Sequence, residues 1–318
     1  MRVALVVQDG CFASSVSSVL DIMRTAELIR PEIDPAIPRL DIEVVAARRR
    51  VALTAGMSVA ATCTLRELDG FDVVIVPALG TITGADTESA LDSRAVKAVV
   101  RALQGLDTRS TRLAAACTGV FPLAETGLLT GRRATTTWFL TPVFRARYPS
   151  VLVDLDQMVV ADGPILTAGA AFAHIDLTLA LLRRVSVDLT RQVARLLLID
   201  DRPSQTGYVT IDHLEHDDPI VLAFERHVRE HLDQPFDTPR AARAIGTSRR
   251  TLERRTRQVL GLSPLDLVQR LRIERASHLR RTTDLSNYAI AQRVGYVNGE
   301  TLRALERRAT NADSGEAL

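Results

Sequence analysis

The stretch RLAAACTGVFPLAETGLL, residues 112–129, decides the fold of the first part of the chain. A short apolar run ends at Cys117, and two small residues, Thr118 and Gly119, lead into a second apolar run with helical spacing. A strand that turns sharply into a helix at a cysteine has the geometry of a nucleophile elbow. Backbone amides at the start of such a helix favour a thiolate or a bound anion. The stretch therefore predicts an α/β domain with a candidate site where a buried strand ends.

The sequence on either side of this stretch alternates strand and helix patterns. Continuous apolar runs, typical of strands buried on both faces, occupy residues 3–7, 42–46, 73–76 and 113–116. Helical patterns include a stretch that opens near Ser14, residues 94–103, and a late helix over residues 171–185. This alternation predicts a parallel, doubly wound sheet with helices on both faces.

The composition of the chain becomes more polar near residue 199. The polar stretch IDDRPSQTGYVTIDHLEHDDP, residues 199–219, is punctuated by proline and glycine and indicates a linker or docking strap. Residues 220–308 show helical patterns without strand-like alternation. We therefore predict an α/β domain over residues 1–198, a linker over 199–219 and an all-α domain over 220–318.

Composition narrows the class of protein. A hydrophobic fraction of 46% with 25% charged residues excludes wholesale disorder. Residues 220–318 carry 18 arginines against 12 acidic residues, a formal charge of +6 that favours a polyanionic partner for this part. Three widely spaced cysteines without a CxxC pair indicate neither a disulfide framework nor a zinc site, so we expect no metal and no cofactor. No signal peptide or membrane span is evident, which predicts a cytoplasmic protein that does not bind membranes.

A helix-turn-helix pattern occupies TPRAARAIGTSRRTLERRTRQVLG, residues 238–261. Thr238 can cap a first helix with Pro239 in its first turn, where the missing N–H costs nothing. Gly246 supplies a tight turn, and Ser248 caps a second, arginine-rich helix that runs to about Leu260. The second helix of such a motif enters the major groove of DNA.

The same pattern recurs further along the chain. Ser286 can cap a helix over residues 288–294, and Gly295 supplies the tight turn after it. Asn298 then caps a second basic helix over residues 300–308. One unit alone is a weak signal, because many helical hairpins look alike, whereas two joined units form a strong one.

A long amphipathic helix is predicted between the two units. Ser263 followed by Pro264 and Asp266 is an N-terminal start signal, and the helical pattern continues to Leu279. We expect its apolar residues to hold the two units together, namely Leu265, Val268, Leu271 and Leu279.

Residues 220–318 resemble the AraC/XylS DNA-binding domain in GTSRRTLERR, GLSPLDLVQRLRIERASHLRRTTDLS and IAQRVGY. The resemblance implies that both second helices enter successive segments of the major groove. Arginine can bridge guanine O6 and N7, and glutamate can accept from cytosine N4. The implied base-reading or helix-opening residues are Ser248, Arg249, Arg250, Glu253 and Arg254 in the first unit and Asn298, Gly299, Glu300, Thr301 and Arg303 in the second. The implied phosphate contacts, which position without specifying, are Arg255, Arg257, Arg307 and Arg308.

The chain departs from the AraC/XylS pattern at three positions. Thr256 and Glu306 stand where an apolar core residue is usual on each recognition helix. Asn311 replaces the glycine that ends the last helix, a mild change because asparagine tolerates the left-handed conformation. An unpaired carboxylate inside a small domain is costly, so we expect the second unit to be looser than the first.

The N-terminal part resembles the class I glutamine amidotransferase-like superfamily, which includes PfpI-type intracellular proteases. Specifically, it resembles the sensor half of GlxA/FtrA-type regulators in CTGVFPLAETGLLTGRRATTTW, YPSV, DGPILTAGA and HIDLTLALL. The resemblance implies a flavodoxin-like α/β fold, and the order of the two halves along the chain is typical of such regulators.

Catalysis at Cys117 would require a base, usually histidine, within hydrogen-bond reach. Where the family usually reads Thr-His-Trp, this sequence reads Thr136-Thr137-Trp138, and His174 on the late helix does not match the enzyme pattern. We therefore predict no catalytic residue. The candidate residues of an effector pocket are instead Cys117, Thr118, Gly119, Thr137, Trp138 and Asp21, the last because the superfamily often places an acidic residue opposite the cysteine.

Three functional hypotheses follow. The first is a nucleoid-associated regulator that binds promoter or operator DNA and senses a small, nitrogen-containing metabolite without catalysis. The second is a cysteine enzyme, such as a deglycase, amidase or hydratase, fused to a DNA-binding domain. The third is a regulator whose N-terminal half only dimerises. For the first hypothesis we expect a homodimer, and RNA polymerase as a further partner if the protein is an activator.

Overall fold

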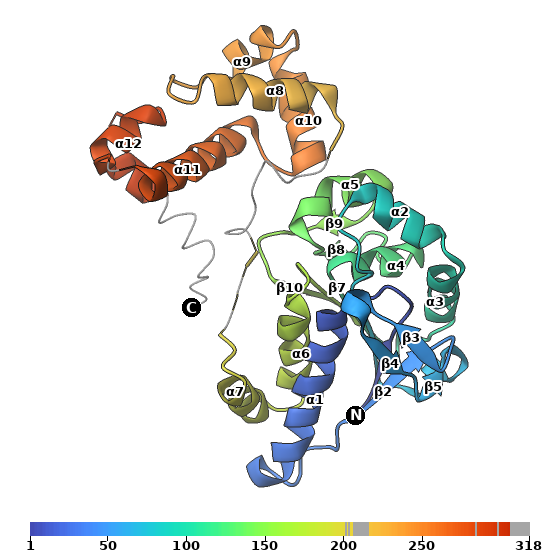
Figure 1. The fold of residues 1–318 in the computed structure, drawn as a ribbon. Helices are drawn as coiled ribbons and strands as arrows, with labels where there is room; N and C mark the ends of the chain where they lie inside the picture. The colour runs from blue at the N-terminus through green and yellow to red at the C-terminus, as the bar shows by residue number, and fades with distance from the viewer. Residues whose placement is uncertain (201, 203, 206–215, 284, 298, 306–318) are drawn as a thin grey trace. The chain divides into compact units, whose positions relative to one another are not determined.

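The computed structural model describes residues 1–200, 202, 204–205, 216–283, 285–297 and 299–305. The chain divides into two compact units (Figure 1). Unit 1 comprises Met1–Leu140 and Tyr148–Gln205, and unit 2 comprises Thr141–Arg147, which form helix α5, together with the chain from Thr206 onward.

Unit 1 is built on a seven-stranded sheet in the order β10-β11-β7-β6-β1-β2-β5. Every neighbouring pair is parallel except β10–β11 at one edge. The predicted parallel, doubly wound sheet is therefore confirmed, and the ends of the four predicted strands differ from the observed ones by at most one residue. The strands are β1 (Arg2–Val6), β2 (Asp41–Ala46), β5 (Cys63–Thr64), β6 (Val73–Val76), β7 (Arg112–Ala116), β10 (Val159–Asp162) and β11 (Ile165–Ala168).

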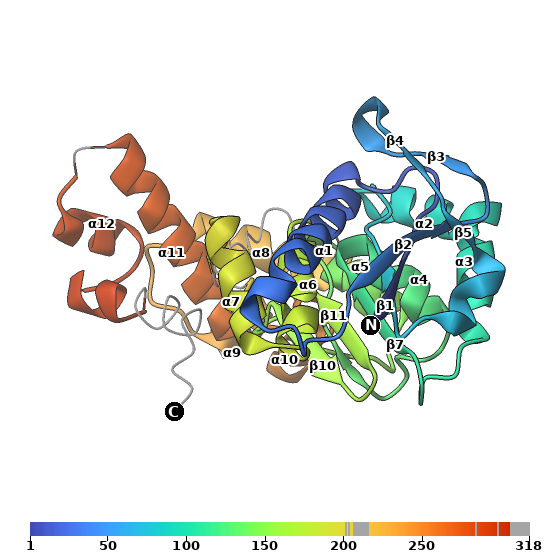
Figure 2. The same cartoon turned by 90° about the horizontal axis from the view of Figure 1, so that it is seen from below.

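Helices cover both faces of this sheet (Figures 1 and 2). One face carries α1 (Ala13–Ile33), α6 (Ala173–Arg183) and α7 (Val187–Leu196), which pack on one another. The other face carries α2 (Gly84–Asp92), α3 (Arg94–Gln104) and α4 (Val120–Glu125). The central strands are buried on both sides, which explains their continuous apolar runs. Alternate strand residues, such as Val3 and Leu5, belong to the core beneath α1, α6 and α7.

Small elements complete unit 1. Two-stranded ribbons pair β3 with β4 and β8 with β9. Their bounds, with those of the first two short 3₁₀ helices, are β3 (Arg50–Ala52), β4 (Ser58–Ala60), β8 (Arg133–Ala134), β9 (Leu152–Val153), η1 (Thr54–Gly56) and η2 (Leu65–Gly70).

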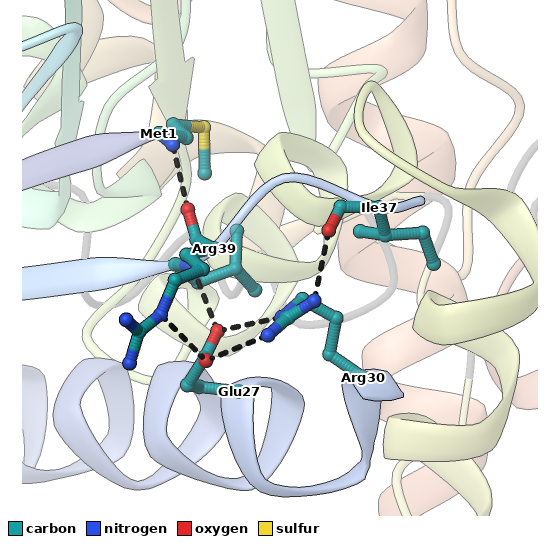
Figure 3. Close-up of polar contacts among 6 residues, drawn as sticks. Met1, Glu27, Arg30, Ile37 and Arg39 are labelled. Carbon is teal, nitrogen blue, oxygen red and sulfur yellow. Dashed lines mark hydrogen bonds and ion pairs between the residues drawn. The ribbon is translucent and has the colours of Figure 1, made fainter. Parts of the chain in front are cut away.

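A polar cluster fixes the connection from α1 to β2 (Figure 3). The Glu27 carboxylate accepts from Arg30 Nε at 3.0 Å and from the Leu40 backbone N–H at 2.8 Å. Arg39 lies 3.8 Å from the same carboxylate, and its carbonyl accepts from the Met1 ammonium at 2.6 Å. The hydrogen bond from Arg30 is the main reason that the pKa of Glu27 is lowered. These contacts join α1 to the segment that enters the sheet.

The described residues of unit 2 form helices and no strand, which confirms the predicted all-α C-terminal part. The helices are α8 (Pro219–Glu230), α9 (Thr238–Ala244), α10 (Arg249–Leu260), α11 (Pro264–Thr282) and α12 (Asn287–Arg293), followed by a helical stretch over residues 299–305. No helix in the described ranges is long and apolar enough to span a membrane.

Three details of the helices differ from the sequence predictions. The late helix of unit 1 begins at Ala173 rather than at residue 171. The cap of α9 is Asp237, whose carboxylate accepts from Arg240 N at 2.9 Å, and Thr238 is the first helical residue. Leu265 is 49% exposed, whereas Leu267 is fully buried, so the buried stripe of α11 begins two residues later than predicted. The other three predicted residues of this stripe, Val268, Leu271 and Leu279, are buried as expected.

Candidate functional site

The chain turns sharply at Cys117, where β7 ends and the short 3₁₀ helix η3 (Cys117–Gly119) leads into α4. Cys117 has a φ of +56°, which is uncommon for a residue other than glycine and stores backbone strain. Its N–H donates to the Gly169 carbonyl at 2.7 Å. A Cβ at Gly119 would lie 2.5 Å from the carbonyl oxygen of Pro77, so this position must be glycine. The turn is thus a strained elbow held by the two neighbouring strand ends.

Threonine side chains surround the Cys117 thiol. Burial, with only 4% of the residue exposed, raises its pKa to about 11, and hydrogen bonds with Thr118 and Thr137 only partly oppose this. The Thr118 hydroxyl also accepts from Leu79 N at 2.9 Å, and the Thr136 hydroxyl donates to the Cys117 carbonyl at 2.9 Å. At neutral pH the group is therefore a neutral thiol, which is a poor nucleophile.

His174 does not serve as a base for this thiol. It lies in the first turn of α6, fully buried, and its Nδ1–H donates to the Ala171 carbonyl at 2.8 Å. Burial lowers its pKa to about 4. No hydrogen bond joins His174 to Cys117 in the described part of unit 1. Thr137 occupies the place beside the thiol where a catalytic base would have to stand.

The other two candidate pocket residues are Trp138, which directly follows Thr137 in the chain, and Asp21 on α1. Trp138 is half-buried in η4 (Trp138–Leu140), and its ring meets that of Phe139 edge to face at 5.5 Å. Asp21 is exposed on α1, with no hydrogen bond or ion pair to the described residues of the elbow. The structure therefore gathers Cys117, Thr118, Gly119 and Thr137, and it does not bring Asp21 to them. Within the described ranges no three His, Cys, Asp or Glu side chains form a metal-binding group.

One buried residue at this site was missed by the sequence analysis. Gln205, from the segment predicted to be a linker, is 1% exposed, and its Nε2 donates to Thr135 Oγ1 and to the Thr136 carbonyl, both at 2.9 Å. Close by in the chain, Arg202 forms an ion pair with Asp176. The polar composition of residues 199–219 indicated a linker or docking strap, but it did not mark Arg202 or Gln205 as the side chains that pack into unit 1.

The first helix-turn-helix in unit 2 has an exposed arginine surface. Gly246 makes the turn with a φ of +73°, and Ser248 caps α10 by accepting from Thr251 N at 3.1 Å. Leu252 and Leu260 are buried on one side of α10. The exposed arginines on its other sides are Arg249, Arg250, Arg254 and Arg257.

Two of the candidate base-reading residues on α10 are paired with each other. Arg249 Nε lies 2.7 Å from Glu253 Oε1, and Arg254 Nη1 donates to Gln258 Oε1 at 3.2 Å. Arg250 and Arg254 are four residues apart and therefore share one face of the helix. This face is the strongest candidate surface for DNA in the described part of unit 2.

Arg255, for which the sequence implied a phosphate contact, has an acidic partner within unit 2. It forms an ion pair with the buried carboxylate of Asp218, which also caps α8 by accepting from Ile220 N and Val221 N at 3.0 Å. This pair joins α8 to α10, the second helix of the first helix-turn-helix. Thr256 is fully buried, and its hydroxyl donates to the Leu252 carbonyl at 2.9 Å, so this departure from an apolar core leaves no unsatisfied donor.

The second helix-turn-helix is described only in part. Ser286 caps α12 by accepting from Ala289 N at 3.2 Å, and Gly295 turns with a φ of +80°. In the helical stretch that follows, Leu302 is buried. Its outward residues are Glu300, Thr301 and Arg303, and Gly299 at its start is half-buried. Candidate residues outside the described ranges are Asn298, Glu306, Arg307, Arg308 and Asn311.

Arg272 on α11 links the two helix-turn-helix units, and the sequence analysis missed it. The residue is buried, and its guanidinium donates to the carbonyls of Leu232 at 3.0 Å and Gln234 at 2.5 Å. The same group lies 5.0 Å from the centre of the Tyr296 ring, directly after the turn at Gly295. In the sequence, Arg272 cannot be told apart from the exposed arginines of the same amphipathic helix, such as Arg275 and Arg280.

Comparison with known proteins gives matches for both parts. Residues 1–184 match the DJ-1/PfpI family, and residues 241–314 match a helix-turn-helix domain. The HTH-type transcriptional regulator CdhR from Pseudomonas aeruginosa is 31% identical over 204 residues, or 63% of this chain and 60% of that protein. The HTH-type transcriptional regulator GlxA from Rhizobium meliloti is 28% identical over 252 residues, covering 77% of this chain and 74% of GlxA. A crystal structure from Vibrio parahaemolyticus, 20% identical with a TM-score of 0.51, covers 62% of this chain and 99% of its own, and shows a shared fold.

Proposed function

The chain belongs to the DJ-1/PfpI family, and from this premise, with the helix-turn-helix match, we propose that it is a sequence-specific DNA-binding transcription regulator. The resemblance to GlxA-type regulators predicted from the sequence is confirmed by these matches and by the relatives CdhR and GlxA. The match to CdhR spans only 60% of that relative, so the proposal rests mainly on the geometry of unit 2.

The observation that carries the proposal is the exposed arginine face of α10. Arg250 and Arg254 project from a capped helix whose opposite side is buried. A recognition helix of this kind presents its first turns to base edges in the major groove. A second helix-turn-helix, joined through α11 and Arg272, would read a neighbouring groove segment. The proposed DNA-binding domain spans residues 220–318, and the proposed sensor domain residues 1–198.

Selection of duplexes from a random library by the full chain would test this proposal. The selected duplex should bind with a fluorescence-anisotropy Kd that Arg250→Ala weakens, with specificity relaxed at one base pair. Arg226→Ala, an exposed arginine on α8 outside both reading helices, is the matched control and should leave specificity unchanged. Failure to enrich any sequence would refute the proposal.

For the elbow we propose effector sensing without catalysis. The protonated thiol, the threonine beside it and the weakly basic His174 all argue against a cysteine nucleophile. The proposed effector is a small nitrogen-containing metabolite, such as an amino acid or a quaternary amine. A thermal-shift panel of such compounds would find it, because a ligand at 100 times its Kd stabilises the folded state by about 2.7 kcal/mol.

Substitution of Cys117 separates sensing from catalysis. We expect Cys117→Ala to keep the fold and the affinity for the selected duplex, and to change only the thermal shift that the effector causes. The measurement is anisotropy and thermal shift on both proteins. A thiol-dependent turnover of simple amides or glyoxals in the wild type, lost in Cys117→Ala, would contradict effector sensing and favour the enzyme hypothesis.

The remaining partners follow from this function. We propose a homodimer located in the cytoplasm at the nucleoid, with RNA polymerase as a partner if the protein activates transcription. A dimer raises the effective concentration of the second DNA-binding domain. The full chain should therefore bind its duplex more tightly than residues 220–318 alone, at equal salt.

A further inference from the structure

Three residues from the segment after α7 are anchored in unit 1 next to the elbow. Arg202 pairs with Asp176 and donates to the Phe172 carbonyl at 2.9 Å. Ser204 is 5% exposed and Gln205 is 1% exposed. We call Arg202, Ser204 and Gln205 the anchor. It is the last part of unit 1 before the chain continues into unit 2.

The orientation of the Gln205 amide is fixed by its partners. The Thr136 carbonyl can only accept, so the group that faces it at 2.9 Å must be the Nε2 donor. The amide oxygen Oε1 then faces Gly169, where a Cβ would lie only 2.6 Å away. Oε1 is buried and has no hydrogen-bond donor among the described residues. The docked amide is thus satisfied on one side only, and a buried acceptor without a donor weakens docking.

A short chain of contacts runs from the anchor to the thiol. Gln205 donates to the Thr136 carbonyl, and the Thr136 hydroxyl donates to the Cys117 carbonyl. The next residue, Thr137, lies close enough to the Cys117 thiol to lower its pKa. Gly169, beside the Gln205 oxygen, accepts from Cys117 N. Thr136 and Thr137 are fully buried in this state. With the anchor docked, a small molecule cannot reach the thiol unless one of these buried groups moves.

We propose that the anchor closes the elbow site and that a molecule occupying the site displaces it. This inference rests on the proposed sensing function and describes how that site would be regulated. The docked state keeps one unsatisfied acceptor, so a ligand with modest preference for the open state shifts the equilibrium. Gln205 is the last residue of unit 1 before the chain continues into unit 2, so the anchor lies at the boundary of the two units along the sequence.

The rate at which iodoacetamide alkylates Cys117 in the full chain tests the closure. Site-resolved mass spectrometry follows Cys117 and, as an internal reference, Cys11, which is also buried in unit 1. Gln205→Ala should raise the Cys117 rate about tenfold, within the 5- to 150-fold range usual for coupled sites. The Cys11 rate should not change.

Two further variants keep the test decisive. Arg202→Ala removes the outer contact of the anchor but leaves Gln205 in place, and it should raise the Cys117 rate by a smaller factor. Arg191→Ala, which breaks a surface pair with Asp188 on α7, is the matched control and should change nothing. Unchanged Cys117 rates in both anchor variants would overturn the proposal. Equal acceleration at Cys11 and Cys117 would also overturn it, because Gln205 would then only stabilise unit 1.

Hydrogen exchange measures the converse effect, namely whether a group attached to Cys117 releases the anchor. Wild-type protein alkylated at Cys117 should exchange faster in the peptide that contains Ser204 and Gln205, while peptides from α3 keep their rates. Unchanged exchange in the anchor peptide would refute displacement. A thermal-shift panel without a hit would count against the effector proposal alone, since neither the alkylation nor the exchange experiment requires a metabolite.

Discussion

The substitution His174→Asn tests whether the buried histidine of α6 is held neutral. In the folded chain its pKa is lowered to about 4 because it is buried, whereas an unfolded histidine titrates at about 6.5. Below pH 6.5 the unfolded state binds a proton that the folded state does not bind until the pH falls to about 4. Stability contributed by the neutral ring is therefore present above about pH 6.5 and is lost as the pH falls toward 4. Between about pH 7 and pH 5 this loss amounts to about 2 kcal/mol.

Urea unfolding followed by the fluorescence of Trp138 is the assay, because this single tryptophan lies in unit 1. The amide of the substituted asparagine can still donate to the Ala171 carbonyl but does not titrate. The variant should be less stable at pH 7, yet its free energy of unfolding should fall by about 2 kcal/mol less than that of the wild type between pH 7 and pH 5. If the free energy of unfolding decreased equally in the two proteins between pH 7 and pH 5, His174 would be protonated in the folded state at pH 5. That result would favour His174 as a base at the elbow.

Further predictions concern unit 2. Arg254→Ala should weaken binding of the selected duplex by about 1–3 kcal/mol and relax specificity at one base pair, which anisotropy on duplexes with single base changes would measure. Arg257→Ala should instead weaken all duplexes alike and lower the slope of log Kd against log salt by about one unit; a base-specific loss would contradict its assignment to phosphate. Arg272→Ala leaves the carbonyls of Leu232 and Gln234 without their donor and should destabilise unit 2 by about 3 kcal/mol, as followed by circular dichroism in urea, and Arg272→Lys should not restore it. Wild-type stability of Arg272→Ala would mean that this link is not structural.

The sequence predicted the elements of unit 1 well because its strands are buried on both faces. Such strands are short, uninterrupted apolar runs, as in residues 73–76, and the elbow follows one of them directly. Asp21 is exposed in the structure, and its position in the helical pattern alone does not say which side of α1 faces the sheet edge. The contact between Thr137 and the thiol was readable only through the family pattern, since the two residues come from separate segments.

In unit 2 the caps and turns were predictable and the polar contacts between helices were not. Ser248, Ser263 and Ser286 act locally, within one helical turn of their partners. Arg255 and Arg272 look like surface arginines in the sequence, but their partners Asp218 and Leu232 lie 37 and 40 residues earlier in the chain. Gln205 escaped prediction for the same reason, because its partners Thr135 and Thr136 lie 70 and 69 residues earlier.

The central claim is that this chain recognises a DNA sequence through two helix-turn-helix units. Its most direct test is the affinity of the full chain for the selected duplex and for scrambled duplexes of equal length, at one physiological salt concentration. We predict a ratio of at least about 10³ in favour of the selected duplex. Scrambling only the half contacted by α10 should cost more affinity than scrambling the other half. Equal Kd values for selected and scrambled duplexes would contradict the claim and leave only non-specific binding by an arginine-rich surface.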